Sequence, residues 1–169
     1  MKNLQAIFLD VDGVLTDGGV WWGPNGEEWK RFCFADIMGV SLARKAGLTV
    51  ALISGEDSPL VDRFASKMGI TAVAKNCKDK AGALQLLAIK CGLELGDICF
   101  MGDDVNDLEA ISLAGLAAAP SSAVPAVLRC AAFVAQKSGG NGAVRELVDA
   151  ILAAKDQAAK QTEVEARPA

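Results

Sequence analysis

The sequence predicts an α/β fold in which a mostly parallel sheet lies between two layers of helices. Short apolar runs typical of buried strands occur at residues 5–9, 48–53, 98–101 and 116–119, with weaker candidates at 70–73 and 132–134. Helix-length segments separate these runs, at residues 36–46, 58–68, 80–91, 106–114, 123–130 and 142–154. Strands that alternate with helices favour right-handed crossovers, so we expect a three-layer, Rossmann-like sheet.

One segment interrupts this alternation after the first predicted strand. Residues 20–22 and 28–30 flank the turn-forming sequence Gly23-Pro24-Asn25-Gly26, which predicts a β-hairpin insertion. The hairpin contains all three tryptophans, which are many for a surface ribbon. It should therefore pack either on the body of the same chain or on a neighbouring subunit, and the sequence leaves both alternatives open.

The length and composition indicate how many domains the chain forms. A chain of 169 residues, about half of them apolar, suits one well-filled core. We expect a single catalytic domain over residues 1–154, without a cap domain, and a frayed tail over residues 155–169, which is polar and rich in alanine. No apolar stretch reaches membrane-spanning length and the first residues do not resemble a signal peptide, which predicts no membrane association and a cytoplasmic location.

Charge and residue usage exclude several classes of function. The net charge is −4 with no basic run, which argues against binding to duplex nucleic acid. Five cysteines form no Cys-x-x-Cys pair, so we interpret them as reduced thiols. The chain has no histidine, which excludes Ser-His-Asp and Cys-His catalysis and imidazole-bound zinc. Acid–base chemistry must therefore fall to carboxylates or lysine.

Two clusters of acids follow predicted strands. Residues 10–17, with Asp10, Asp12 and Gly13, follow the first strand, and residues 102–107, with Asp103, follow the strand at 98–101. The carboxyl ends of parallel strands form the ligand crevice of such a sheet, so both clusters should face one site. Two carboxylates about 5 Å apart repel by roughly 3 kcal/mol at an effective dielectric near 20. A divalent cation relieves that repulsion, and oxygen ligands favour magnesium.

Two further polar residues suit the same site. Ser54 follows the predicted strand at 48–53, and Lys80 begins the predicted helix at 80–91. A hydroxyl and an ammonium group can bind the charged oxygens of a phosphoryl group during its transfer. Alone, Ser54 could merely begin a turn and Lys80 could be a surface charge. Together with the two acid clusters, in this order along the chain, they indicate phosphoryl transfer.

These motifs together resemble the haloacid dehalogenase superfamily of phosphatases. The hairpin and residues 139–146 are similar to its cap-less branch, which includes 3-deoxy-manno-octulosonate (KDO) 8-phosphate phosphatase and deaminoneuraminate (KDN) 9-phosphate phosphatase. The similarity extends over about residues 4–152. The matching residues are Asp10, Val11, Asp12, Gly13, Val14, Leu15, Thr16, Ser54, Lys80, Gly102, Asp103, Asp104 and Asp107.

The resemblance implies a role for each polar residue. Asp10 would attack phosphorus to form an aspartyl-phosphate, and Asp12 would act as the general acid and then the general base. Ser54 and Lys80 would bind phosphoryl oxygens. Magnesium would be held by Asp10, the backbone carbonyl of Asp12 and Asp103, with support from Asp104 and Asp107.

The same resemblance implies a 2-keto-3-deoxy sugar-acid phosphate as the substrate and a homotetramer whose subunits close each other's sites. The substrate-binding residues would be Asp12, Cys33, Phe34, Ala35, Asp36, Ile37, Glu56, Arg63, Lys67 and Lys80, and those after the hairpin would act mainly through backbone groups. Glu56 stands where the KDO enzymes usually carry arginine, and Asp36-Ile37-Met38-Gly39 departs from their Asp-Gly-x-Gly pattern. Both departures favour the nine-carbon KDN 9-phosphate, with KDO 8-phosphate as the alternative.

Two other classes of protein share part of the pattern. A signalling receiver domain also carries strand-end acids and a lysine, but its acceptor aspartate follows a later strand, where this chain has Ser54. A catalytically silent assembly domain is the other alternative. The presence of Asp10, Asp12, Lys80 and Asp103 together argues against it.

Overall fold

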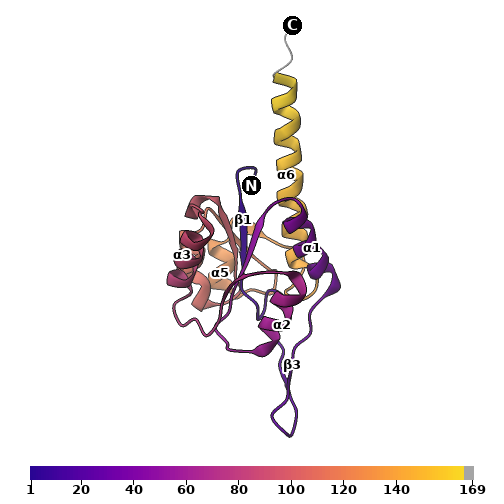
Figure 1. Ribbon diagram of the computed structural model, residues 1–169, viewed down its shortest axis with the longest axis vertical. Helices are drawn as coiled ribbons and strands as arrows, with labels where there is room; N and C mark the ends of the chain where they lie inside the picture. The colour runs from indigo at the N-terminus through magenta and orange to yellow at the C-terminus, as the bar shows by residue number, and fades with distance from the viewer. Residues whose placement is uncertain (166–169) are drawn as a thin grey trace.

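A six-stranded parallel sheet forms the centre of the protein (Figure 1), seen in a computed structural model that describes residues 1–165. Its strands lie in the order β5-β4-β1-β6-β7-β8, and each neighbouring pair is parallel. The strands are β1 (Ala6–Leu9), β4 (Thr49–Ile53), β5 (Ala72–Ala74), β6 (Ile98–Met101), β7 (Leu116–Ala119) and β8 (Phe133–Val134). The predicted α/β sheet is confirmed, and the six strands match the six predicted apolar runs closely.

Helices cover both faces of the sheet because each strand buries side chains on both sides. Ile7 and Leu9 of β1 belong to one hydrophobic cluster, and Phe8 belongs to the other. The first cluster is covered by α1 (Phe34–Lys45), α2 (Pro59–Met68) and α6 (Ala143–Glu165). The second is covered by α3 (Lys80–Cys91), α4 (Leu108–Leu113) and α5 (Pro125–Cys130), and the short 3-10 turns are η1 (Leu95–Asp97) and η2 (Val105–Asp107).

The strand order places the ends of three strands side by side. The chain runs from β1 outward to β4 and β5, then returns to the other side of β1 for β6. At the carboxyl edge, Leu9 of β1 is aligned with Leu52 of β4 and Met101 of β6. This point of reversal is where open α/β sheets bind ligands. The residues that follow β1, β4 and β6 therefore meet at one site.

The predicted hairpin is confirmed as the antiparallel pair β2 (Trp21–Trp22) and β3 (Glu28–Trp29). A β-bridge between Thr16 and Phe32 closes its base. Figure 1 shows the hairpin projecting from the body at the end opposite to the free end of α6. The side chain of Trp22 is 78% exposed, and the other two tryptophans are also exposed. Packing on the body of the same chain is therefore partial, because Trp29 lines a pocket together with residues of α2, and packing on a neighbouring subunit stays a prediction.

The C-terminal helix is longer than predicted. α6 continues to Glu165, so the tail expected to fray from residue 155 is helical as far as residue 165. Alanine, lysine, glutamine and glutamate have high helix propensity, and no proline or glycine lies between residues 154 and 165 to end the helix. The last four residues of the predicted tail lie outside the described part of the chain. Within residues 1–165, no helix is both long and apolar enough to cross a lipid bilayer.

Candidate active site

A pocket of about 250 Å³ lies at the carboxyl edge of the sheet, between the loops that follow β1, β4 and β6 and the start of α3. It brings together the two acid clusters and Lys80, as the sequence predicts. Its lining residues are Asp10, Asp12, Gly13, Gly18, Gly55, Glu56, Lys80, Asp103, Asp104 and Asn106.

Asp10 is the first residue after β1 and is buried. Its backbone N–H donates to the carbonyl of Met101 at 3.0 Å, which fixes it beside the end of β6. The chain then turns at once, because the N–H groups of Leu15 and Thr16 both donate back to the carbonyl of Val11. This turn keeps Asp12 at the carboxyl edge of the sheet, so that Asp10 and Asp12 both line the pocket.

Lys80, at the start of α3, forms ion pairs with two buried carboxylates. Its Nζ lies 2.9 Å from Asp10 Oδ1 and 2.6 Å from Asp107 Oδ1. Burial opposes the charged form of Lys80, but Asp10 and Asp107 raise the pKa of its ammonium group above the usual value. The lysine therefore remains a cation that orients Asp10.

Asp107 organises the loop after β6. While Oδ1 accepts from Lys80, Oδ2 accepts hydrogen bonds from the backbone N–H groups of Asp103 and Asp104, at 2.9 and 3.1 Å. The Asp104 carboxylate caps the following turn by accepting from the N–H of Val105. Both oxygens of Asp107 are thus already bonded, which suits the supporting role predicted for it.

The carboxylates fit a divalent cation. One oxygen from each of Asp10, Asp103 and Asp107 lies within 4.8 Å of the others. Burial, and next the charge of Asp107, raises the pKa of Asp10 well above its usual value and that of Asp103 to about 6. Asp107 already accepts three hydrogen bonds, which suits its predicted supporting role, and the assignment of Asp10 and Asp103 as the metal-binding carboxylates stays a prediction. Hard oxygen donors at a buried, negatively charged site are the ligands that magnesium prefers.

Ser54 lies behind the pocket rather than on its wall. The residue is fully buried, and its Oγ accepts a hydrogen bond from the N–H of Glu56 at 3.1 Å. Gly55 and Glu56, which follow it, line the pocket in its place. The hydroxyl therefore shapes the loop after β4, and Glu56 joins Asp12 and Lys80 as a predicted substrate residue that lines this pocket.

Lys30 is a site residue that the sequence analysis assigned only to the hairpin. It follows β3, and its Nζ lies 2.9 Å from Asp12 Oδ1 and 3.4 Å from Glu28 Oε1. Its side chain is only 3% exposed. No local pattern distinguishes this lysine from a solvated one, because its burial depends on how the hairpin folds back toward Asp12. Gly18 and Asn106 also line the pocket, although the sequence analysis gave neither residue a role.

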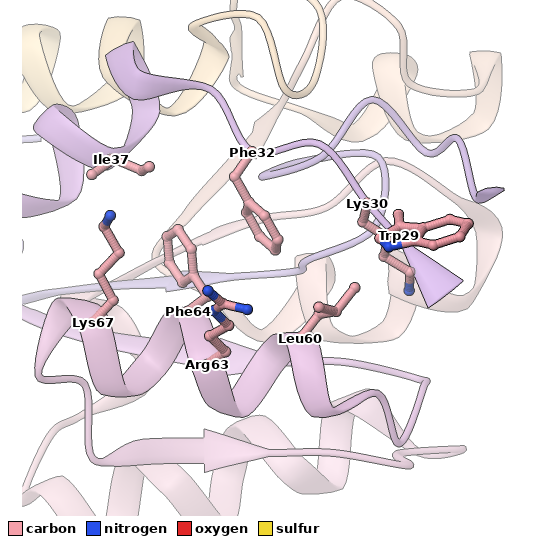
Figure 2. A pocket seen from close by; sticks show the side chains of 8 residues that line it. All are labelled: Trp29, Lys30, Phe32, Ile37, Leu60, Arg63, Phe64 and Lys67. Atoms are coloured by element: carbon pink, nitrogen blue, oxygen red, sulfur yellow. The ribbon is translucent and has the colours of Figure 1, made fainter. Parts of the chain in front are cut away.

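A second pocket, of about 300 Å³, adjoins the other side of Lys30. Figure 2 shows Phe32 and Phe64 facing one another, with ring centroids 4.8 Å apart, while Arg63 and Lys67 project from α2. The pocket is lined by Trp29, Lys30, Phe32, Ile37, Leu60, Arg63, Phe64 and Lys67. It therefore combines apolar walls with three cationic groups, and it contains the predicted substrate residues Ile37, Arg63 and Lys67.

The side chain of Asp36, one of the predicted substrate residues, is buried against the start of α6. It is 1% exposed, and its two oxygens accept hydrogen bonds from the N–H groups of Gly142 and Arg145, both at 3.0 Å. The unpaired N–H groups at the start of α6 attract a carboxylate, and Asp36 supplies it from α1. Asp36 lines neither of the two pockets described above, so its side chain has a structural role, and a substrate contact through its backbone stays a prediction.

The remaining predicted substrate residues lie at the start of α1 and outside both pockets. Cys33 is the residue before the helix, and its carbonyl accepts the N–H of Ile37 at 3.1 Å. Phe34 is 79% exposed, with Lys67 Nζ 5.9 Å from its ring centroid, and Ala35 is exposed. Their roles toward a substrate stay predictions.

Comparison with known proteins supports this architecture. A family model described as haloacid dehalogenase-like hydrolase matches residues 45–147. The 3-deoxy-D-manno-octulosonate 8-phosphate phosphatase of Escherichia coli K12 is 35% identical over 154 residues, which are 91% of this chain and 82% of that protein.

Two solved structures of the same kind of enzyme are also similar. That from Yersinia pestis has a TM-score of 0.90 and 34% identity, covering 92% of this chain and 84% of its own. That from Moraxella catarrhalis, in complex with magnesium, phosphate and KDO, has a TM-score of 0.89 and 33% identity, covering 96% and 94%.

Facing carboxylates follow the central strands of the parallel sheet, and a buried lysine at the start of α3 pairs with Asp10. This arrangement is the framework of a hydrolase that transfers phosphoryl groups. The chain belongs to the haloacid dehalogenase-like hydrolases, and its fold, site and relatives are those of a phosphatase. The resemblance inferred from the sequence motifs is confirmed, and the family assignment excludes the receiver-domain alternative.

The comparisons support the eight-carbon alternative better than the nine-carbon prediction. The relatives named above are KDO 8-phosphate phosphatases. The two departures that favoured KDN are Ile37, in place of the glycine of the Asp-Gly-x-Gly pattern, and Glu56. Ile37 lines the second pocket and Glu56 lines the first, so both arguments remain.

Proposed function

We propose that the chain is a magnesium-dependent phosphatase that acts through an aspartyl-phosphate on a 2-keto-3-deoxy sugar-acid phosphate, with KDO 8-phosphate as the favoured substrate. The observation that carries this proposal is the position of Asp10. It lies at the end of the central strand β1, is paired with Lys80 at 2.9 Å, and shares a pocket with Asp103. The similarity to KDO 8-phosphate phosphatases supports the substrate class.

Magnesium is the proposed cofactor, and the relative from Moraxella catarrhalis is described in complex with this ion. In this chain it would be held by Asp10, the backbone carbonyl of Asp12 and Asp103, while Asp104 and Asp107 support the loop. The bound ion would neutralise the charge that the carboxylates and the phosphoryl group bring together.

In the first step, Asp10 forms a bond to phosphorus through a carboxylate oxygen. The ester P–O bond breaks, and its electron pair goes to the leaving sugar oxygen, which takes a proton from the Asp12 carboxyl group. Lys80 holds Asp10 in place and can donate to a phosphoryl oxygen. Ser54, which is buried beside the pocket, contributes mainly by fixing the loop that carries Gly55 and Glu56.

In the second step, a water molecule attacks phosphorus and gives its proton to the Asp12 carboxylate. The bond between Asp10 and phosphorus breaks, which returns the electron pair to Asp10 and releases inorganic phosphate. Asp12 is then protonated again, so the two steps leave Asp10 and Asp12 as they began.

The sugar acid would extend from the first pocket toward the second. Arg63 and Lys67 offer cations for its carboxylate, and the apolar walls around Phe32 and Phe64 offer contact area. Glu56, on the wall of the first pocket, would accept hydrogen bonds from sugar hydroxyls. Because a glutamate at this position favours the nine-carbon acid, KDN 9-phosphate is the second candidate substrate.

We also propose that neighbouring subunits close the site in a homotetramer. The hairpin projects from the carboxyl edge with Trp22 78% exposed, and Phe34 at the start of α1 is 79% exposed. Large exposed aromatic side chains mark association surfaces. Light scattering coupled to size-exclusion chromatography tests this proposal: we expect the mass of four chains, and Trp22→Ser should reduce it. A monomer that is fully active at nanomolar concentration would contradict it.

Turnover of a substrate panel tests the proposed function. With magnesium, we expect phosphate release from KDO 8-phosphate with a higher kcat/KM than from KDN 9-phosphate, and loss of nearly all turnover in Asp10→Asn. The reverse order of the two esters would favour the second candidate and leave the mechanism intact. Substantial turnover in Asp10→Asn would remove Asp10 as the nucleophile.

A further inference from the structure

The contacts of Lys30 form a continuous series that begins at Asp12 and ends at α2. Lys30 Nζ lies between Asp12 Oδ1, at 2.9 Å, and Glu28 Oε1, at 3.4 Å. Glu28 Oε1 also accepts a hydrogen bond from Ser58 Oγ at 3.1 Å, and Ser58 is the N-cap of α2. Asp12, two residues after the nucleophile, is thus connected to α2 through the base of the hairpin.

Two further features hold Lys30 in this position. Its side chain is 3% exposed, so it is surrounded by protein. The bridge between Thr16 and Phe32 ties the hairpin to the loop that carries Asp12. The carboxylates of Asp12 and Glu28 lie on either side of the Lys30 ammonium group, at 2.9 and 3.4 Å. The lysine is therefore a fixed cation.

Asp12 depends on this cation for its orientation. The Asp12 side chain is 29% exposed, but its Oδ1 atom is buried and accepts no well-aligned hydrogen bond from the described residues. The contact with Lys30 is therefore an electrostatic ion pair without hydrogen-bond geometry. This attraction offsets the cost of burying the oxygen. Without the lysine, burial of this oxygen would cost free energy that no attraction offsets, so the carboxylate would rotate toward water.

We propose that Lys30 is a positioning residue that holds the Asp12 carboxyl group where it meets the leaving oxygen of the substrate and, later, the attacking water. This inference rests on the proposed function, in which Asp12 is the general acid and base. Lys30 itself contacts neither phosphorus nor the leaving oxygen in this account. It acts on the reaction only through Asp12.

The proposal predicts a dependence on the leaving group that a purely structural role would not produce. A sugar alkoxide is a poor leaving group and needs the proton from Asp12, whereas p-nitrophenolate leaves without one. Misplacement of Asp12 should therefore slow the first step for the sugar-acid phosphate but not for p-nitrophenyl phosphate. The second step needs Asp12 as a base with either substrate, so it should slow for both.

Rapid-quench kinetics with Lys30→Met and Lys30→Arg, with magnesium present, test this prediction. For Lys30→Met we expect kcat with KDO 8-phosphate to fall by about 10²-fold, within the range for loss of a general acid or base. With p-nitrophenyl phosphate we expect a burst of about one equivalent of p-nitrophenolate per site, followed by slow turnover. Lys30→Arg, which keeps the cation, should recover most of the loss.

Three comparisons make the result decisive. Asp12→Asn should show the same burst, and Lys45→Met, at an exposed lysine near the end of α1, should behave like the unmodified enzyme. If Lys30→Met does not fold, Glu28→Gln, which removes one of the two anionic partners of Lys30, should show a weaker form of the same burst. Thermal unfolding of each variant reports whether it folds.

The proposal is overturned if Asp12→Asn shows the burst while Lys30→Met, or Glu28→Gln in its place, does not. It is also overturned if Lys30→Met slows the first step equally for both substrates, because that result indicates general damage to the site. Failure of the proposed function would look different: Asp10→Asn would remain active, or the unmodified enzyme would hydrolyse neither ester.

Discussion

The backbone at Gly13 lies directly against the carboxylate of Asp103. A Cβ atom at Gly13 would be 2.0 Å from Asp103 Oδ2, and the residue has a φ of +86°. A side chain at residue 13 would therefore displace the Asp103 carboxylate. This contact brings the acid cluster after β1 within reach of Asp103, so that both can share one cation.

Gly13→Ala should abolish magnesium binding and lower kcat by at least about 10²-fold, because a shift of about 1 Å at a catalytic site has that effect. The measurement is the rise in melting temperature on adding magnesium, together with turnover. Gly47→Ala is the matched control, since Gly47 has a similar φ of +82° but no atom within 4 Å of an added Cβ. Equal effects of the two substitutions would show that backbone strain, rather than the contact with Asp103, is responsible.

Lys80→Met should lower the free energy of unfolding by about 3–5 kcal/mol, because it leaves the buried carboxylates of Asp10 and Asp107 without their cation. Urea unfolding at neutral pH without magnesium measures this loss. Lys75→Met is the control: Lys75 pairs with the exposed residues Asp57 and Asp62, and exposed ion pairs contribute little. Similar losses for the two variants would contradict the assigned role of Lys80.

Magnesium binding should strengthen as pH rises through about 6, because burial raises the pKa of Asp103 to about 6 and that of Asp10 well above its usual value. Between about pH 4 and pH 6 the metal-free folded protein holds protons that the unfolded chain has released, so its stability falls as pH rises. The cation binds the deprotonated carboxylates, so its affinity changes in the opposite direction.

Calorimetric titration with magnesium at about pH 5 and about pH 8 measures this dependence, with proton release expected at the lower pH. Unfolding of the metal-free protein at the same two pH values provides the independent comparison. An affinity that is the same at both pH values would contradict the assignment of Asp10 and Asp103 as the carboxylates that hold the ion.

Asp36→Ala should destabilise the fold without changing recognition of the substrate. The N–H groups of Gly142 and Arg145 would lose their buried acceptor, which costs about 1–3 kcal/mol. We expect a lower midpoint in urea and an unchanged KM at a temperature where the variant is folded. A large rise in KM with unchanged stability would restore the substrate-binding role that the sequence suggested.

The sheet and the nucleophile region were predictable because their signals are local. A buried apolar run followed by acids identifies both the end of a parallel strand and the residues that emerge from it, as at Leu9 and Asp10. The same reasoning placed Lys80 at the start of α3 and brought it to the site.

Other features depended on tertiary contacts that no local pattern encodes. Lys30 reaches Asp12 only because the hairpin folds back at its base, and Asp36 was taken for a substrate residue although its partners, Gly142 and Arg145, lie far along the sequence. The helical extension to Glu165 was missed because a polar, alanine-rich segment is compatible with either a helix or a frayed end.

Trapping of the covalent intermediate tests the central claim most directly. The enzyme is mixed with magnesium and substrate, quenched with acid within the first turnover, reduced with borohydride, digested and analysed by mass spectrometry. An aspartyl-phosphate at residue 10 would be reduced to homoserine, so the account predicts homoserine at that position, and none in Asp10→Asn or without substrate. Full phosphate release with an unmodified residue 10 at every time point, or with the modification at another carboxylate, would contradict the account.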